Sequence, residues 1–441
     1  MFRLKFNPNT LRKLRRFRSI KRGYYSFLLL VVFVALALLG PLLVSNRALV
    51  VHYNGEYFFP TFGGIVPGKT FGLDYDYETN YRALKEHFAE ENKGDWVLLP
   101  PVPFNGTEVG EVYGELTFRD GVYLSPEDGQ PLVEGKACLL HPNGRPARTW
   151  QVLGGKLHGT MQGFDTHGNL IEKGRWEEGK RVSYTPLSPE LPKEFSEPRL
   201  DKLRTFLPYP NRPGLGGHLL GTDESGRDVV ARLFYGFRIL CTASVIYLFF
   251  TYVIGVAMGC AMGYFGGWFD MIVQRFIEIW SNIPQLYLII FLTSLLVPNL
   301  FWLMLILVAF SWITLTYYMR TGTYREKERE YVSAARLLGA STPRIIFRHI
   351  LPNTLSTVVT FAPFLVAMVV FQLTALDFLG FGLPPTEPTW GEMLKQGKEN
   401  FDHPWILGSV VTCLVGLLVL ITFVGEAIRE AFDPKKFTTY Q

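Results

Sequence analysis

Residues Gly63 to Thr70 have the spacing of a phosphate-binding loop, in which a second glycine is followed by Lys69 and Thr70. Such a loop holds nucleotide phosphates only where it joins a buried strand to the N-terminus of a helix. The residues that follow, Phe71 to Tyr77, are acidic and aromatic and do not predict an amphipathic helix. We therefore reject a nucleotide site, and we expect no catalytic residue, metal ligand or cofactor in this chain.

A second group of reactive side chains lies in or beside apolar segments, where polar residues usually face a cavity or a partner instead of lipid. The candidates for a pathway through the membrane are Glu278, Asn282, Gln285, Gln372 and Asp377. Glu278 has an alternative explanation, because Arg275 lies three residues before it and a local ion pair accounts for it equally well.

A third group, Arg325 to Leu338, is dense in helix formers and charged on one face, which predicts a short amphipathic helix. Gly339 is placed to end it in a left-handed cap, and Ser341–Pro343 is placed to begin a second helix. Small side chains at Ala334 and Ala335 would let another protein approach closely. The alternative is a solvated loop between two spans.

The elements that position these residues are membrane spans. Of the 441 residues 48% are hydrophobic, and they are bunched into runs longer than the ~20 residues that cross a bilayer. This excludes a disordered, collagenous or purely soluble protein. Six spans are predicted, at about 25–45, 239–263, 272–297, 301–319, 354–377 and 405–425.

Glycine and proline predict how these spans pack and bend. Gly255, Gly259 and Gly263 recur every four residues on one face of the second span. This spacing predicts close helix packing. Pro284 predicts a kink in the third span.

Charge predicts the orientation of the chain in the membrane. Residues 1–24 hold nine Lys and Arg and no acid, and 320–350 holds seven, whereas the opposite loop 378–404 has only two. By the positive-inside rule, the basic arm 1–24, the loop 320–353 and the tail 426–441 are expected in the cytoplasm. Both termini then lie on that side. We expect the arm to meet anionic lipids and not nucleic acid.

The polar stretch 46–220 is then extracytoplasmic and too long for a connector. Turn signals such as Asn143-Gly144 and Glu178-Gly179 separate short β-prone runs, which predicts a β-rich domain. Glycines recur with a period of 24, as in surface hairpin repeats, although chance turn spacing explains two copies as well. The Pro-rich segment 186–213 is predicted to be a linker.

The segment Glu330 to Pro352 resembles the EAA loop of bacterial ABC-importer permeases of the dipeptide and oligopeptide group. The likeness extends over about 220 to 435, through Leu220–Val229, Phe378–Pro384 and Trp390–Leu394. Finer features, among them Gly425–Phe432, are most similar to the Yej-type subgroup associated with oligopeptide and microcin C uptake.

The resemblance implies an all-α membrane permease of six helices, with a transmembrane domain over 221–435 and the β-rich domain inserted after the first span. It implies a coupling role for Glu330, Tyr331, Ala334, Ala335, Arg336, Gly339 and Ala340. The expected partners in the inner membrane are a second permease subunit, ATPase subunits that use the ATP, and an extracytoplasmic peptide-binding protein. The chain itself is not expected to be an enzyme.

Two features depart from this family pattern. Ser333 stands where many relatives have the glutamate that names the motif, so no role is assigned to a carboxylate there. The stretch 107–195 is an apparent insertion relative to the subgroup, and the resemblance says nothing of its role.

Two other functions remain open at this stage. An ion-coupled secondary transporter would use Glu278 and Asp377 as proton sites, although no inverted repeat supports it. An envelope sensor or interaction protein would make the domain 46–220 the functional part. Transport without an ATPase would favour the first, and intact transport after deletion of 107–195 would make that segment accessory.

Overall fold

The computed structural model describes residues 8–110, 113–126, 129–188, 203–207, 209–295 and 298–432. The chain divides into two compact units. Unit 1 comprises Met1–Leu38, Tyr235–Lys398 and Gly408–Gln441, and unit 2 comprises Leu39–Phe234 and Glu399–Leu407. The ends of the predicted arm and tail, 1–7 and 433–441, lie outside the described residues.

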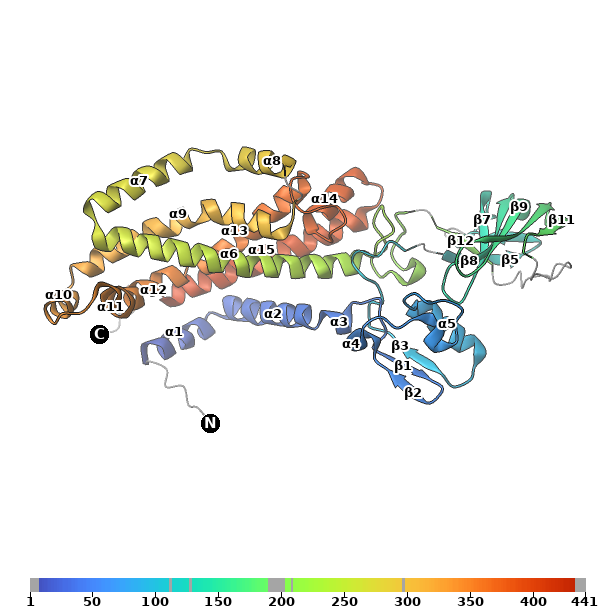
Figure 1. Ribbon diagram of the computed structural model, residues 1–441, viewed down its shortest axis with the longest axis horizontal. Helices are drawn as coiled ribbons and strands as arrows, with labels where there is room; N and C mark the ends of the chain where they lie inside the picture. Colours follow the sequence, from blue (N-terminus) through green and yellow to red (C-terminus); the bar gives the residue numbers. More distant parts are fainter. Residues whose placement is uncertain are drawn as a thin grey trace. The chain divides into compact units, whose positions relative to one another are not determined.

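Unit 1 is built from helices (Figure 1). The helices that lie in it wholly or mainly are α1 (Pro8–Ser19), α2 (Lys21–Leu38), α6 (Val229–Phe265), α7 (Gly267–Ser281), α8 (Gln285–Leu295), α9 (Leu300–Lys327), α10 (Glu330–Leu337), α11 (Thr342–Ile345), the π-helix η4 (Ile346–Ile350), α12 (Leu351–Val359), α13 (Ala362–Phe378), α14 (Trp390–Glu399) and α15 (Pro404–Phe432).

Four helices among the described residues, α2, α6, α9 and α15, are long and apolar enough to cross a membrane. The pair α7 and α8 passes the same test together but is bent by 71°, which confirms the kink predicted at Pro284. The predicted span 354–377 is divided between two helices, because α12 ends at Val359 and α13 begins at Ala362. Pro363 lies in the first turn of α13, where the missing N–H is tolerated but helix continuation is not.

The three glycines of α6 all pack against α9. A Cβ added to Gly255 would lie 2.9 Å from the Cβ of Leu315, and one added to Gly263 would lie 2.6 Å from that of Thr323. At Gly259 it would lie 2.7 Å from the carbonyl oxygen of Thr316. The two helices therefore meet at backbone distance along several turns.

Unit 2 contains a small three-stranded antiparallel sheet of order β2-β1-β3. Its elements are α3 (Gly40–Leu43), β1 (Val50–Tyr53), β2 (Glu56–Phe58), α4 (Pro60–Gly63), the 3-10 helix η1 (Gly68–Phe71), α5 (Tyr81–Glu91) and β3 (Trp96–Leu98). Val51, Leu84 and Phe88 form part of its core. The rejected phosphate-loop pattern falls on α4 and η1, and Lys69 pairs with Asp76 at 2.7 Å.

Unit 2 also contains a seven-stranded antiparallel sheet of order β11-β10-β9-β8-β7-β12-β4 and a hairpin, β5-β6. The strands are β4 (Tyr113–Glu115), β5 (Thr117–Arg119), β6 (Val122–Leu124), β7 (Glu134–Leu140), β8 (Pro146–Leu153), β9 (Lys156–Phe164), β10 (Leu170–Glu177), β11 (Lys180–Pro186) and β12 (Arg204–Phe206). Trp150, Met161 and Trp176 lie in its core. The predicted β-rich region is confirmed.

The glycines of the 24-residue period lie in the turns of this sheet. Gly144 and Gly168 have φ of +81° and +92°, and Gly155 and Gly179 have +75° and +81°, values that favour glycine. The prediction of a linker over 186–213 is wrong at Arg204–Phe206. These residues form β12, which lies in the sheet between β7 and β4. Residues 189–202 of that segment lie outside the described residues.

Candidate coupling site and polar residues of the helices

The helix predicted over Arg325 to Leu338 is interrupted. Arg325 and Lys327 belong to the last turn of α9, and α10 begins only at Glu330. The N–H of Arg329 donates to the carbonyl of Glu326 at 3.1 Å, so the chain turns between the two helices. The short α10 then lies with α11 at one end of the helices of unit 1 (Figure 1).

The corner between α10 and α11 is built on glycine. Gly339 has φ of +76°, the left-handed conformation predicted for the cap. The N–H groups of Gly339 and Ala340 donate to the carbonyls of Arg336 and Ala335, each at 3.0 Å, which closes the end of α10. Ser341 occupies the N-cap position of α11 but makes no capping hydrogen bond through its side chain.

The inner face of the corner is a small apolar core. Val332, Ile345 and Ile350 are almost fully buried, with Tyr264 and Ala340 packed against them. Ala335 is also buried. We expected it to face another protein, but its side chain instead lies on the inner face of α10.

The outer face of the corner exposes two leucines that the sequence reasoning missed. Leu337 and Leu338 are 89% and 88% exposed, and Phe347 on η4 is 69% exposed. Glu330, Ala334, Arg336 and Gly339 are exposed beside them. Large apolar side chains left in water at a helix end are typical of a binding surface. A leucine pair directly before a capping glycine was the available signal.

Tyr331 ties the corner to its neighbours. Its hydroxyl donates to the Glu326 carboxylate at the end of α9 and accepts from Asn353 Nδ2 on α12 at 2.9 Å. Partial burial and the hydrogen bond to Glu326 raise the pKa of Tyr331, so it stays a neutral donor.

Two cations of the loop lie over the ring of Tyr264, near the end of α6. Lys327 Nζ and the Arg336 guanidinium carbon are each 5.8 Å from the ring centroid. At this distance both cations are attracted by the ring. The corner is thus connected to α6 as well as to α9 and α12.

An ion pair joins α7 to α9. Arg320 Nε and Nη2 donate to the two carboxylate oxygens of Asp270 at 2.6 and 2.5 Å, and the hydroxyl of Tyr324 donates to the same carboxylate at 2.7 Å. We counted Arg320 among the basic residues of the loop, but it lies within α9 with its charge paired. Its partner is 50 residues away, so no local pattern predicts the contact.

Three pathway candidates lie at the bend between α7 and α8. Glu278 pairs with Arg275 at 2.5 Å and accepts from Gln274 at 3.2 Å. Asn282 donates to the Glu278 carbonyl at 2.6 Å, and Gln285 begins α8. The local ion pair with Arg275, which was the alternative explanation for Glu278, is therefore present.

The other two candidates lie on α13. Gln372 has a buried side-chain oxygen without a hydrogen-bond partner among the described residues. Asp377 is 3% exposed and accepts from the backbone N–H of Leu383 at 2.8 Å, which holds the turn after α13. Across the described part of the chain, no hydrogen bond or ion pair links these residues to the group at the α7–α8 bend.

Within the described ranges, no group of three or more His, Cys, Asp and Glu side chains could hold a metal ion. The four cysteines, Cys138, Cys241, Cys260 and Cys413, are all free thiols.

Comparison with known proteins relates the chain to a family. Residues 255–438 match the family model described as the inner membrane component of binding-protein-dependent transport systems. That range includes the corner, the glycine face of α6 and all five pathway candidates.

Curated relatives extend the match over the rest of the chain. The chain is 32% identical over 433 residues to the peptidoglycan transport system permease protein YejE of Agrobacterium fabrum, covering 98% of this chain and 94% of the relative. It is 32% identical to the inner membrane ABC transporter permease protein YejE of Escherichia coli, covering 96% of each. An oligopeptide transport system permease protein of Haemophilus influenzae is 34% identical over 221 residues, covering 50% of this chain and 71% of the relative.

Proposed function

Because the chain belongs to the family of inner membrane components of binding-protein-dependent transport systems, the permeases of ABC importers, we propose that it carries peptides across the inner membrane. Subunits of this family are not catalytic. A role in peptide import is supported by the similarity to relatives that are oligopeptide transport system permease proteins.

The observation that carries the proposal is the corner of α10 and α11. It combines an exposed apolar tip, Leu337 and Leu338, with a buried base, Val332, Ile345 and Ile350. A tip of this kind fits a groove on a partner, and a packed base moves as one body when the tip is pushed. We assign the partner to a cytoplasmic ATPase subunit that uses ATP.

The contacts of the corner define a route for this push. Tyr331 connects it to α9 and α12, and Tyr264 connects it to α6. The glycine face joins α6 to α9, and Asp270 joins α7 to α9. Displacement of the corner would thus move these helices together. The helices would then bend at the breaks between α7 and α8 and between α12 and α13.

We further propose that a second, homologous permease subunit completes the pore and that a peptide-binding protein delivers the substrate from outside. In this arrangement both termini and the loop 320–353 are cytoplasmic, and 46–220 is extracytoplasmic, with 107–195 as an insertion. The seven basic residues of 320–350 support this orientation.

Gln372 is the pathway candidate that the geometry favours, because its buried oxygen is left without a partner in the described residues. Glu278 and Asp377 have local partners, so we propose neither as the proton site of an ion-coupled transporter.

The test is ATP-dependent uptake of labelled peptide by vesicles that contain the permeases, the ATPase and the binding protein. Replacing both Leu337 and Leu338 with Glu should abolish uptake and release the ATPase from the membrane, since two charges would enter an apolar groove. The stability of the permease should not change, because both side chains are exposed. Phe118→Glu, at an exposed site on β5, is the control for a surface charge substitution. Wild-type uptake by the double variant would contradict the assignment of the corner.

A further inference from the structure

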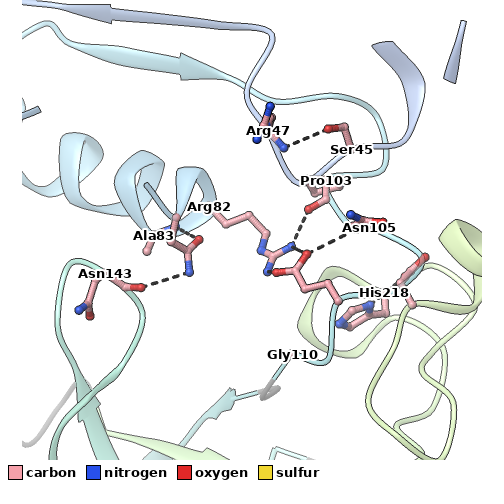
Figure 2. A network of polar contacts seen from close by, with 12 residues as sticks. Ser45, Arg47, Arg82, Ala83, Pro103, Asn105, Gly110, Asn143 and His218 are labelled. Carbon is pink, nitrogen blue, oxygen red and sulfur yellow. Dashed lines mark hydrogen bonds and ion pairs between the residues drawn. The ribbon is translucent and has the colours of Figure 1, made fainter. Parts of the chain in front are cut away.

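A cavity of about 450 Å³ lies within unit 2. Its walls come from α5, the loop before β4, the end of β7 and the loop that precedes α6. Figure 2 shows part of this region, with Arg82 extending from α5 toward Pro103 and His218 near its end. The volume is within the range of pockets that hold small organic ligands.

The lining carries an excess of negative charge. Among the described residues of the lining, two guanidinium groups are opposed by five carboxylates, which gives these side chains a formal charge of −3 with the histidines counted as neutral. The arginines are Arg82 and Arg204, and the carboxylates are Glu86, Glu90, Glu108, Glu115 and Asp228.

Neither arginine is left to attract an anion. Arg82 Nη2 lies 2.7 Å from Glu108 Oε1, and it donates through Nη1 to the carbonyl of Pro103 at 2.6 Å. Arg204 Nη2 lies 2.9 Å from Glu86 and 3.6 Å from Glu115. The excess of carboxylates over guanidinium groups among the described lining residues therefore favours a cation.

A buried histidine supplies an acceptor in the same cavity. The side chain of His218 is 5% exposed, and its Nδ1 lies 2.8 Å from Asp228 Oδ2. Because a carboxylate only accepts, Nδ1 carries a proton, and in the tautomer with its one proton on Nδ1 the ring keeps a lone pair on Nε2. Nε2 has no hydrogen-bond partner among the residues that the structure describes.

The position of this ring is fixed on more than one side. It stacks on Phe104 with centroids 4.0 Å apart, and Arg82 lies 4.5 Å from the centroid of the same Phe104 ring. The other oxygen of Asp228 accepts from the N–H of Ala231 at 2.6 Å, in the first turn of α6. His218 is thus a preorganised acceptor and not a mobile surface side chain.

We propose that this cavity binds an organic cation, whose ammonium or guanidinium group donates to His218 Nε2 and whose charge offsets the excess carboxylates. The source of the group is a free polyamine or a basic side chain of a short peptide, and the chemistry is the same for both. The site lies outside the pathway candidates, and binding there requires neither ATP nor transport.

The test uses the purified full-length permease in detergent, titrated calorimetrically with spermidine and with the blocked tripeptide acetyl-Ala-Lys-Ala-amide. The matched neutral probe is acetyl-Ala-Gln-Ala-amide. We expect saturable binding of at least one cation and none of the neutral peptide, with binding weakened by salt. Binding of spermidine alone identifies a free amine as the ligand, and binding of the lysyl peptide alone identifies a side chain.

Two variants and one control test the residues. Glu90→Gln should weaken cation binding about three- to tenfold, as expected for one charge near a partly solvated site. His218→Asn keeps a short donor for Asp228 but removes the ring nitrogen Nε2, and should weaken binding about tenfold or more. Glu91→Gln, the next residue on α5 and not part of the lining, should weaken binding less than Glu90→Gln.

Three results would overturn the proposal: no binding of either cation, equal binding of the neutral peptide, or equal losses in Glu90→Gln and Glu91→Gln. If His218→Asn lowers the melting temperature, Glu90→Gln still decides, because Glu90 is exposed on α5. Loss of transport with cation binding retained would count against the proposed function and not against this site.

Discussion

Replacing Gly339 with Val should uncouple transport without unfolding the permease. Gly339 has φ of +76°, and a Cβ placed there would meet no atom within 4 Å. The added Cβ therefore creates no clash, and the main cost of the substitution is the left-handed backbone. Such a backbone costs an ordinary residue roughly 1–2 kcal/mol, and a β-branched side chain is the least suited to it.

That cost corresponds to a loss of about 5- to 30-fold in the population of the formed corner relative to opened forms. The loss is confined to the corner, since the core of Val332, Ile345 and Ile350 is not touched. Asn is the matched control, because its short polar side chain tolerates the left-handed conformation. Gly339→Asn should therefore keep most of the coupling that Gly339→Val loses.

The assay is peptide uptake and ATP hydrolysis, measured in the same vesicles at equal amounts of permease. Gly339→Val should lower the peptide taken up per ATP hydrolysed about tenfold, which lies within the expected loss of the formed corner. Gly339→Asn should lower it by less than about threefold. Wild-type uptake by Gly339→Val, or equal loss in both variants, would refute the argument that the left-handed cap shapes the docking surface.

Gly259→Leu should prevent close packing of α6 on α9, because even a Cβ would lie 2.7 Å from the Thr316 carbonyl oxygen, and should lower the melting temperature and the folded yield in detergent. Asp270→Asn should destabilise the permease by about 3–5 kcal/mol, since it leaves the Arg320 charge unpaired, and denaturant unfolding with Arg320→Gln as the second mutation should show coupling. Trp150→Ala removes a side chain that is 1% exposed and should lower the free energy of unfolding of the seven-stranded sheet by about 3–5 kcal/mol. Faster limited proteolysis of that sheet should show the loss, and peptide uptake is a separate readout.

The sequence predicted features that depend on nearby residues. The left-handed cap at Gly339 follows from a glycine directly after a helical pattern, and the kink at Pro284 follows from a missing N–H. The turns at Gly144 and Gly168 follow from Asn-Gly and His-Gly pairs between β-prone runs.

Features that depend on distant residues were not predicted. The ion pair of Asp270 with Arg320 joins residues 50 apart in sequence, and β12 enters the sheet from a segment that its proline content marked as a linker. The face of α10 that packs inward is set by contacts of Val332 with Ile345 and Ile350, on α11 and η4, and the pattern of α10 alone does not show these contacts, so the burial of Ala335 was missed. Helix ends were also misplaced: α6 begins at Val229 and α9 continues to Lys327, since polar residues extend helices past their apolar stretch.

The 24-residue period of the seven-stranded sheet limits how this sheet can change in length. One period, from Gly144 to Gly168, contains two strands, β8 and β9, and two turns. Because one period holds two antiparallel strands, its loss or duplication keeps strand direction, and Val152 and Trp176, which are 24 residues apart, are both buried. A single strand added or lost would reverse the direction of the chain. The sheet can therefore grow or shrink in evolution by whole hairpins, and an engineered deletion of 145–168 should close at the same turn.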